Sequence, residues 1–276
     1  MLFRSPGIHP GDVLTSVYEL ALNRGRPQEA QRLAGAISPD WSSVDRLAVV
    51  VLSALYGDGD TAAAAAALRA LGRQVEAPFA AGAKLRHSQF EYVCVVQQWR
   101  VAHGDFAGTP AALAKLRVPD PSAPAWLTMQ NAACSAALEV SLAASRARPE
   151  TGLLLHRLDS MVQTIPGWKW SFPRHRMVAR LWETQGEWGR ALTAIRRRPH
   201  GAVRYLAADL REEARLAALA GDTAGAVHAY RHYLALRFDP EPVLRPQVEA
   251  VRAVLAHLGA KASGPGGPRS RDAVMR

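Results

Sequence analysis

Two pairs of arginines are the side chains in this sequence whose type and spacing best suit binding chemistry. Arg176 and Arg180 are four residues apart, and Arg211 and Arg215 repeat the same interval. In a helix this spacing places both members of a pair on one face. A guanidinium can donate two parallel hydrogen bonds to a carboxylate or a phosphate. The four arginines therefore predict a basic wall in a concave groove, where a non-catalytic scaffold or regulatory module binds an acidic peptide or a partner domain.

Three glutamates offer these arginines a different role. Glu183, Glu212 and Glu213 lie close to the arginines in the sequence and carry the opposite charge. Ion pairs between exposed side chains are common on helix surfaces and contribute little to stability. The sequence alone leaves two interpretations open, a free basic wall or a set of solvated ion pairs.

A second cluster of candidate partner-binding residues combines aromatic rings with positive charge. Trp168 and Trp170 flank Lys169 in the segment 166–176. Aromatic faces beside cations can stack nucleobases or hold a peptide. Together with a formal net charge of +10, this cluster favours an alternative function, a nucleic-acid-associated transcriptional regulator whose arginines contact phosphates. The other interpretation is structural, because aromatic side chains also anchor long connections.

Motifs for catalysis, cofactors and metals are not found in the sequence. It contains no Gly-x-Ser-x-Gly motif, no His-Glu-x-x-His motif and no Walker loop. His228 and His232 are spaced to share a helix face and bind a metal, but no third ligand has a suitable spacing. We therefore expect a protein that is not an enzyme and that holds no metal or cofactor.

Cys94 and Cys134 are the only cysteines, and each lies in an apolar helical pattern. Two cysteines without metal-ligand spacing indicate neither a disulfide framework nor a zinc site, so we expect free, buried thiols in a reducing compartment. The first ten residues do not resemble a secretory signal. The most apolar stretch, Leu47–Tyr56, is too short to cross a membrane. These features predict a cytoplasmic location and no membrane partner.

A repeated pair of small residues indicates how the chain is organised. An apolar segment ends at a small residue, and five positions later another small residue opens the next segment. Glycine at the first position allows the left-handed backbone that ends a helix, and a small second residue allows close packing. The residue four positions before the first small residue is expected to face the partner helix. The first small residues of the six copies are Gly25, Gly59, Gly104, Ala147, Gly186 and Gly221.

The intervals between these six residues are 34, 45, 43, 39 and 35, which are typical of helical repeats such as the tetratricopeptide repeat (TPR). We predict an all-α fold, a right-handed solenoid of about six TPR-like helical hairpins. Residues 246–258 lack a partner segment and are expected to form a C-terminal capping helix. The predicted division is an N-terminal extension at 1–10, the helical repeat domain at 11–259 and a disordered tail at 260–276.

The last two copies resemble a class of bacterial modules. The segments LWETQGEWGRALTAIRRRP and REEARLAALAGDTAGAVHAYRHYLALRFDPEPVLRPQVEAVRAVL are similar to the tetratricopeptide-like C-terminal regions of bacterial serine/threonine protein kinases and to bacterial transcriptional activator domains. The resemblance implies a regulatory or protein-binding module. Kinase activity is not expected, because the chain has no HRD-type catalytic loop and no DFG motif.

Overall fold

The computed structural model describes residues 10–36, 43–81, 87–118, 123–165, 173–198 and 204–263. Within these ranges the secondary structure is helical and contains no strand, so the predicted all-α fold class is confirmed. None of the described helices is both long enough and apolar enough to span a membrane.

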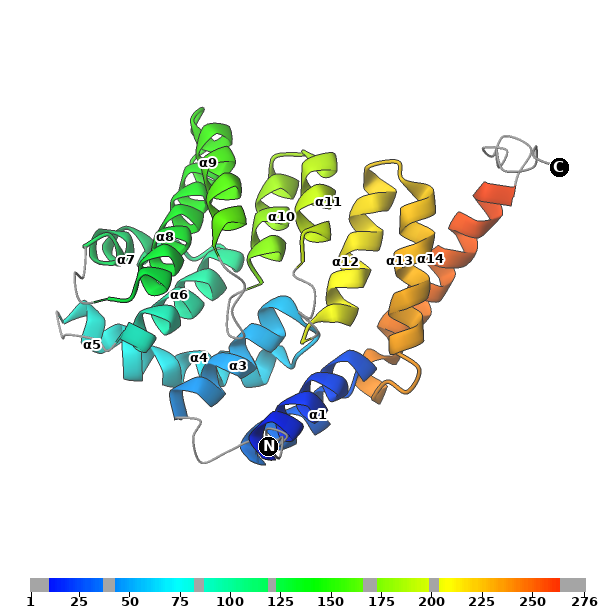
Figure 1. The fold of residues 1–276 in the computed structure, drawn as a ribbon, viewed down its shortest axis with the longest axis horizontal. Helices are drawn as coiled ribbons and strands as arrows, with labels where there is room; N and C mark the ends of the chain where they lie inside the picture. The colour runs from blue at the N-terminus through cyan, green and yellow to red at the C-terminus, as the bar shows by residue number, and fades with distance from the viewer. Residues whose placement is uncertain are drawn as a thin grey trace, which may run out of the picture.

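Most helices form pairs with the next helix in the chain, and a short turn joins the two members of a pair (Figure 1). Each pair packs against the next along the chain, and α14 packs against α13. Short helical segments η1 (Gly72–Glu76), α5 (Ala77–Ala80) and η2 (Pro242–Leu244) join some of the longer helices. The longer helices are α1 (Pro10–Arg24), α2 (Pro27–Ala36), α3 (Ser43–Tyr56), α4 (Thr61–Leu71), α6 (His87–Ala102), α7 (Thr109–Leu116), α8 (Ala125–Ser145), α9 (Thr151–Thr164), α10 (Arg174–Thr184), α11 (Trp188–Arg196), α12 (Leu206–Leu219), α13 (Thr223–Leu236) and α14 (Arg245–Ser263).

Local sequence explains where several helices begin. Asp60 accepts hydrogen bonds from the backbone nitrogens of Ala62 and Ala63 at 2.7 and 3.1 Å, which satisfies two donors that the first turn of α4 leaves open. A run of alanines follows, and alanine has the highest helix propensity of any residue type. Asp222 starts α13 in the same way and accepts from the Gly225 nitrogen at 2.9 Å.

The turns between paired helices have the backbone conformation that the small-residue pattern predicts. Five of the six predicted turn residues have a positive φ. Gly59 is the exception, and its role is spatial, since a Cβ there would lie 2.8 Å from backbone atoms of Ser53 and Ala54. The φ angles of the other five are 83° at Gly25, 79° at Gly104, 49° at Ala147, 73° at Gly186 and 82° at Gly221.

The residues that were predicted to contact the partner helix, on either side of these turns, are buried. The second small residue of four copies is at most 1% exposed, at Ala30, Ala64, Ala191 and Ala226. The position four residues before the turn is buried in five copies, at Ala21, Leu55, Ala143, Trp182 and Ala217. Small side chains at the turn therefore let the two helices of a pair approach closely.

The apolar core runs along the chain rather than filling one centre. One cluster of buried residues joins α1 and α2 to Val49 of α3, and the next joins α3, α4, α6, α7 and α8. A third extends from α8 to α13, and a fourth joins α12, α13 and α14. Each of these clusters therefore joins helices that are close to one another in the sequence.

The two ends of this succession of helices meet. Figure 1 shows α1 beside one end of α12, and the two helices pack against each other. Asn23 of α1 accepts a hydrogen bond from the Ala207 nitrogen at 2.8 Å, and Glu19 pairs with Arg204 at 3.3 Å. The carboxylate of Glu241, after α13, accepts from the Gln28 and Glu29 nitrogens at 3.0 and 3.1 Å and so caps α2.

The predicted domain limits differ from the observed helices in small ways. Helix α1 already includes Pro10, which the prediction assigned to the N-terminal extension. Helix α14 continues to Ser263, four residues into the predicted disordered tail. The remaining parts of these two predictions, at 1–9 and 264–276, lie outside the described residues.

Two glycines in the α10–α11 pair test the role of the turn conformation. Gly186 has a φ of 73° and open space around its Cβ position, so Gly186→Ala adds backbone strain without a steric clash. We expect a loss of about 1–2 kcal/mol in the free energy of unfolding, measured by urea denaturation. The control is Gly189→Ala, inside α11 and also in open space, which should leave stability unchanged or raise it by up to about 1 kcal/mol. Equal effects of the two changes would contradict this explanation.

Candidate functional site

Arg176 of α10 lies in the interior of the protein and is 2% exposed. Its guanidinium donates to the backbone oxygen of Tyr56, at the end of α3, and to the Ala208 oxygen at 3.1 Å. It also pairs with the Asp209 carboxylate at 3.3 Å, and Asp209 accepts from His175 at 3.0 Å. Burial lowers the pKa of Arg176, and the negative charge of Asp209 opposes this change. Arg176 is therefore an internal connection between α3, α10 and α12.

Arg180 lies one turn further along α10 and is half-buried. Its Nη2 donates to the Leu55 oxygen at 2.7 Å, and its guanidinium lies over the Tyr56 ring at 5.1 Å. These contacts are with a neutral carbonyl and a neutral ring. No carboxylate of a described residue forms an ion pair with Arg180, so its charge is the least neutralised of the four predicted arginines.

Arg211 of α12 pairs with Asp58, which directly follows α3, at 2.9 Å. The side chain of Asp58 is only 5% exposed. It also pairs with Arg237, at the end of α13, and accepts from Gln247 of α14 at 3.2 Å. Arg237 is itself 2% exposed and donates to the Leu22 oxygen of α1 at 2.5 Å. Asp58 thus joins four parts of the chain that are distant in sequence.

Arg215 pairs with two glutamates, Glu183 at 2.5 Å and Glu212 at 2.6 Å. Although burial opposes it, the hydrogen bond and charge of Arg215 hold the pKa of Glu212 below its usual value. The side chain of Arg215 is 40% exposed, so solvent reaches this cluster. Ion pairing by nearby glutamates, the alternative that the sequence left open, is therefore observed at Arg215.

The structure brings the four predicted arginines together but gives them unequal access to solvent. Arg176 is enclosed, so the predicted open wall is corrected at this residue, and a partner would have to displace the end of α3 to reach it. Arg180, Arg211 and Arg215 remain half-buried on α10 and α12. Glu213 does not pair with these four and instead contacts Arg196 and Arg198 at 3.1 and 2.5 Å. The two other predicted residues, Trp168 and Trp170, lie outside the described residues.

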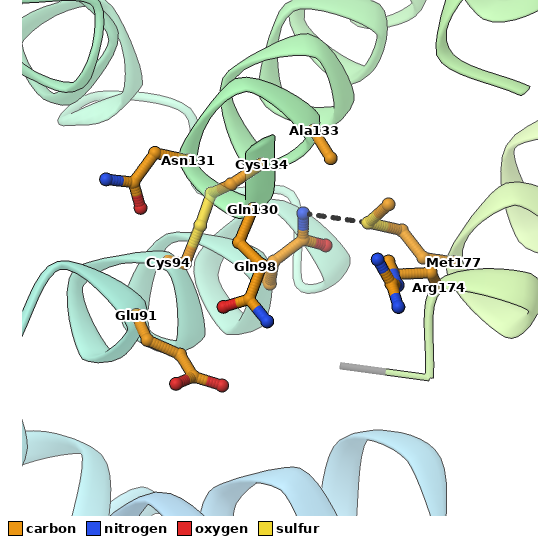
Figure 2. Close-up of a pocket in the computed structure, with 9 residues that line it drawn as sticks. All are labelled: Glu91, Cys94, Gln98, Gln130, Asn131, Ala133, Cys134, Arg174 and Met177. Carbon is orange, nitrogen blue, oxygen red and sulfur yellow. Dashed lines mark hydrogen bonds between the residues drawn. A yellow bond between two sulfur atoms is a disulfide. The ribbon is translucent and has the colours of Figure 1, made fainter. Parts of the chain in front are cut away.

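A hollow of about 430 Å³, including its solvent-filled mouth, lies where α6, α8 and α10 meet (Figure 2). Residues 91, 94 and 98 occupy one face of α6, and residues 130, 131, 133 and 134 face them from α8. Arg174 and Met177 line the hollow from α10. The sequence prediction did not include this site. Polar residues at helical spacing inside the apolar segments around the two cysteines are the feature that indicates it.

A disulfide between Cys94 and Cys134 forms one wall of the hollow (Figure 2). This corrects the prediction of two free thiols. The two Cα atoms lie 6.2 Å apart, which is within the range of protein disulfides. The two cysteines are 40 residues apart in the sequence. They meet because α6 packs directly against α8, although α7 lies between these helices in the sequence. A local sequence pattern does not show which helices pack against a helix other than the next one in the chain.

Two amide side chains of the hollow lack strong hydrogen-bond partners among the described residues, and a carboxyl group lies close to them. Gln130 has a buried carbonyl oxygen without a hydrogen-bond partner. Gln98 is 8% exposed, and its amide nitrogen donates to the Met177 sulfur at 3.3 Å, which is a weak acceptor. Burial, with a smaller contribution from Asp45, raises the pKa of Glu91 to about 7.

The described residues contain no group of three or more histidine, cysteine, aspartate or glutamate side chains arranged to hold a metal. The rings of His228 and His232 do lie together on α13, with their centroids 4.2 Å apart. Comparison of the chain with protein-family models, with curated proteins and with solved structures gave no match. These comparisons therefore assign no function to the chain.

Removal of the disulfide should weaken the protein measurably. A crosslink that closes a loop of this length stabilises a chain by about 3–4 kcal/mol in the chain-entropy model. We expect a reducing agent to lower the free energy of unfolding by about this amount in urea denaturation. A Cys94→Ala, Cys134→Ala variant is the control, since its stability should not respond to the reductant. Alkylation of both cysteines in the native, unreduced protein would contradict the disulfide.

The buried Asp58 carboxylate should be far more important than its exposed neighbour Asp60. Asp58→Asn leaves the buried Arg237 without its charged partner, and loss of one member of a buried pair typically costs about 3–5 kcal/mol. Asp60→Asn should cost less than about 0.5 kcal/mol, because asparagine caps a helix as well as aspartate does. Thermal and urea unfolding of both variants measure the difference. Comparable stability of the two variants would show that Asp58 does not hold the ends together.

Proposed function

We propose that this chain is a non-catalytic scaffold that binds an acidic segment of a protein partner on the arginines of α10 and α12. In this proposal the fold is a right-handed, TPR-like solenoid of about six hairpins with α14 as its cap. Turn residues with positive φ, buried small residues five positions later and a core divided along the chain all support it. The resemblance of the last two hairpins to regulatory modules of bacterial kinases and transcriptional activators supports the same role.

The observation that carries the proposal is the incomplete neutralisation of Arg180. Among the described residues, its contacts are the Leu55 carbonyl and the Tyr56 ring, neither of which bears a charge. Arg215 is next to it on the neighbouring helix, as indicated by Glu183 of α10, which pairs with Arg215 of α12. A carboxylate of a partner can pair with Arg180 and exchange with Glu183 or Glu212 at Arg215. Charge-assisted hydrogen bonds of this kind are stronger than neutral ones.

Arginines outside the proposed site form ion pairs within the chain, which favours a protein partner over nucleic acid. Arg196, Arg197 and Arg198, the densest basic run in the sequence, contact carboxylates on other helices. Nucleic-acid binding depends on cations that are free to replace the counterions of phosphates. These three arginines therefore already pair with carboxylates of this chain and stabilise contacts between its helices. The nucleic-acid function remains an outcome that the experiment below can reveal.

An array of acidic peptides tests the proposal directly. The unmodified protein should bind a subset of the peptides, and Arg180→Glu combined with Arg215→Glu should weaken this binding at least tenfold, a loss of about 1.4 kcal/mol or more. The matched control is Arg231→Glu on the exposed side of α13, which alters the net charge on another helix. Equal binding by the double variant and the control would overturn the proposal. Tight, steeply salt-dependent binding to duplex DNA or RNA, without peptide binding, would favour the alternative function.

A further inference from the structure

The accessible part of α12 changes from charged to apolar along the helix. After the first turn, the residues of α12 that are not buried are Arg211, Glu212, Arg215, Ala218 and Leu219. Arg211, Arg215 and Leu219 follow one another at intervals of four residues, so they share one face of the helix. The side chain of Arg215 is 40% exposed, and Leu219 is 48% exposed. This face thus begins with cations and ends with a large apolar side chain in solvent.

Helix α14 shows the same order on the face that carries Gln247. Gln247 donates to the Asp58 carboxylate at 3.2 Å, and Arg211 of α12 pairs with the same carboxylate. Val254 lies seven residues, about two helical turns, after Gln247 and therefore on the same face of α14. It is 42% exposed. Figure 1 shows α12 and α14 both running away from α1 toward the opposite edge of the molecule. Two faces that meet at Asp58 therefore both become apolar with distance from it.

The apolar end of α12 directly follows the cations of the proposed partner surface. Leu219 lies one helical turn beyond Arg215, and Glu183 of α10 pairs with Arg215, so Leu219 continues the surface that α10 and α12 share. Single exposed apolar residues are ordinary on a protein surface. Exposed apolar side chains beside a group of cations, in contrast, have the composition of a protein interface, where apolar contacts are bordered by charged ones. A partner that supplied only carboxylates would leave Leu219 and Val254 in water.

We infer that the acidic segment of the partner carries a large apolar side chain that packs on Leu219 and Val254, an inference that rests on the proposed function. Its carboxylates pair with Arg180 and Arg215. Four residues of a helix span about 6 Å along its axis. An extended segment covers this length with two residues, and the side chains of residues two positions apart point to the same side. The partner motif is therefore an acidic residue and a large aliphatic or aromatic residue two positions apart.

Two probes from the array of acidic peptides test this motif by isothermal titration calorimetry on the full-length chain. One is a short peptide with a run of glutamates and a leucine two positions after the last of them, and the other has alanine in place of that leucine. The leucine peptide should bind at least tenfold more tightly, because the alanine peptide buries less apolar surface. Both peptides carry the same charge, so the comparison isolates the apolar contact.

A pair of variants locates the contact on the protein. Leu219→Ser combined with Val254→Ser should weaken binding of the leucine peptide about tenfold and leave binding of the alanine peptide nearly unchanged. The matched control is Leu153→Ser combined with Val243→Ser, since these side chains are 55% and 63% exposed on α9 and η2. The control should bind both peptides as the unmodified protein does. Circular dichroism confirms that both variants are folded.

The outcomes distinguish the apolar contact from the charged one. Equal affinity of the two peptides for the unmodified protein would overturn the inference, as would equal effects of the Leu219, Val254 variant and its control. In either case, loss of binding in the Arg180→Glu, Arg215→Glu variant would leave the proposed function in place. Failure of every acidic peptide to bind would overturn both. If the Leu219, Val254 variant does not fold, the two peptides still test the motif, and the leucine peptide should show the more negative heat-capacity change on binding.

Discussion

One buried carboxylate, Asp58, holds the two ends of the helical array together. It lies at the end of α3 and pairs with Arg211 and Arg237, while Gln247 donates to it from α14. Arg237 then reaches the Leu22 oxygen of α1. Burial of charged groups is costly, so these contacts need not add much to overall stability. They do impose a unique arrangement, because any other register of the ends would leave buried charges without partners.

The geometry around Arg237 explains why the first turn is glycine. A Cβ at Gly25 would lie 3.0 Å from the Arg237 guanidinium and 3.2 Å from Pro240, and its φ is 83°. The closure also determines which arginines are accessible. Arg176, Arg180 and Arg211 all contact the end of α3 or the residues that follow it. Arg215 contacts Glu183 and Glu212 instead, and its side chain is 40% exposed. Arg180 and Arg215 carry the proposed partner site.

The sequence predicted what depends on near neighbours and missed what depends on distant ones. The turn at Ala147, with a φ of 49°, and the burial of Trp182 and Ala217 follow from the repeated spacing of small residues. That spacing sets the contacts within each helix pair. The pairing of Cys94 with Cys134 and the contact of Asp58 with Arg237 connect helices that are not consecutive in the chain. Their positions depend on how far the whole array curves, which no local pattern specifies.

The distance between the two ends of the array in solution tests the closure most directly. Spin labels on exposed positions of α2 and α13, introduced as Arg32→Cys and Arg231→Cys, leave the native cysteines in their disulfide. Pulsed electron paramagnetic resonance should give a single narrow distance distribution in agreement with the structure, and Asp58→Asn should broaden it toward longer distances. A broad distribution already present with Asp58 intact would show that the array is open, and would contradict the account.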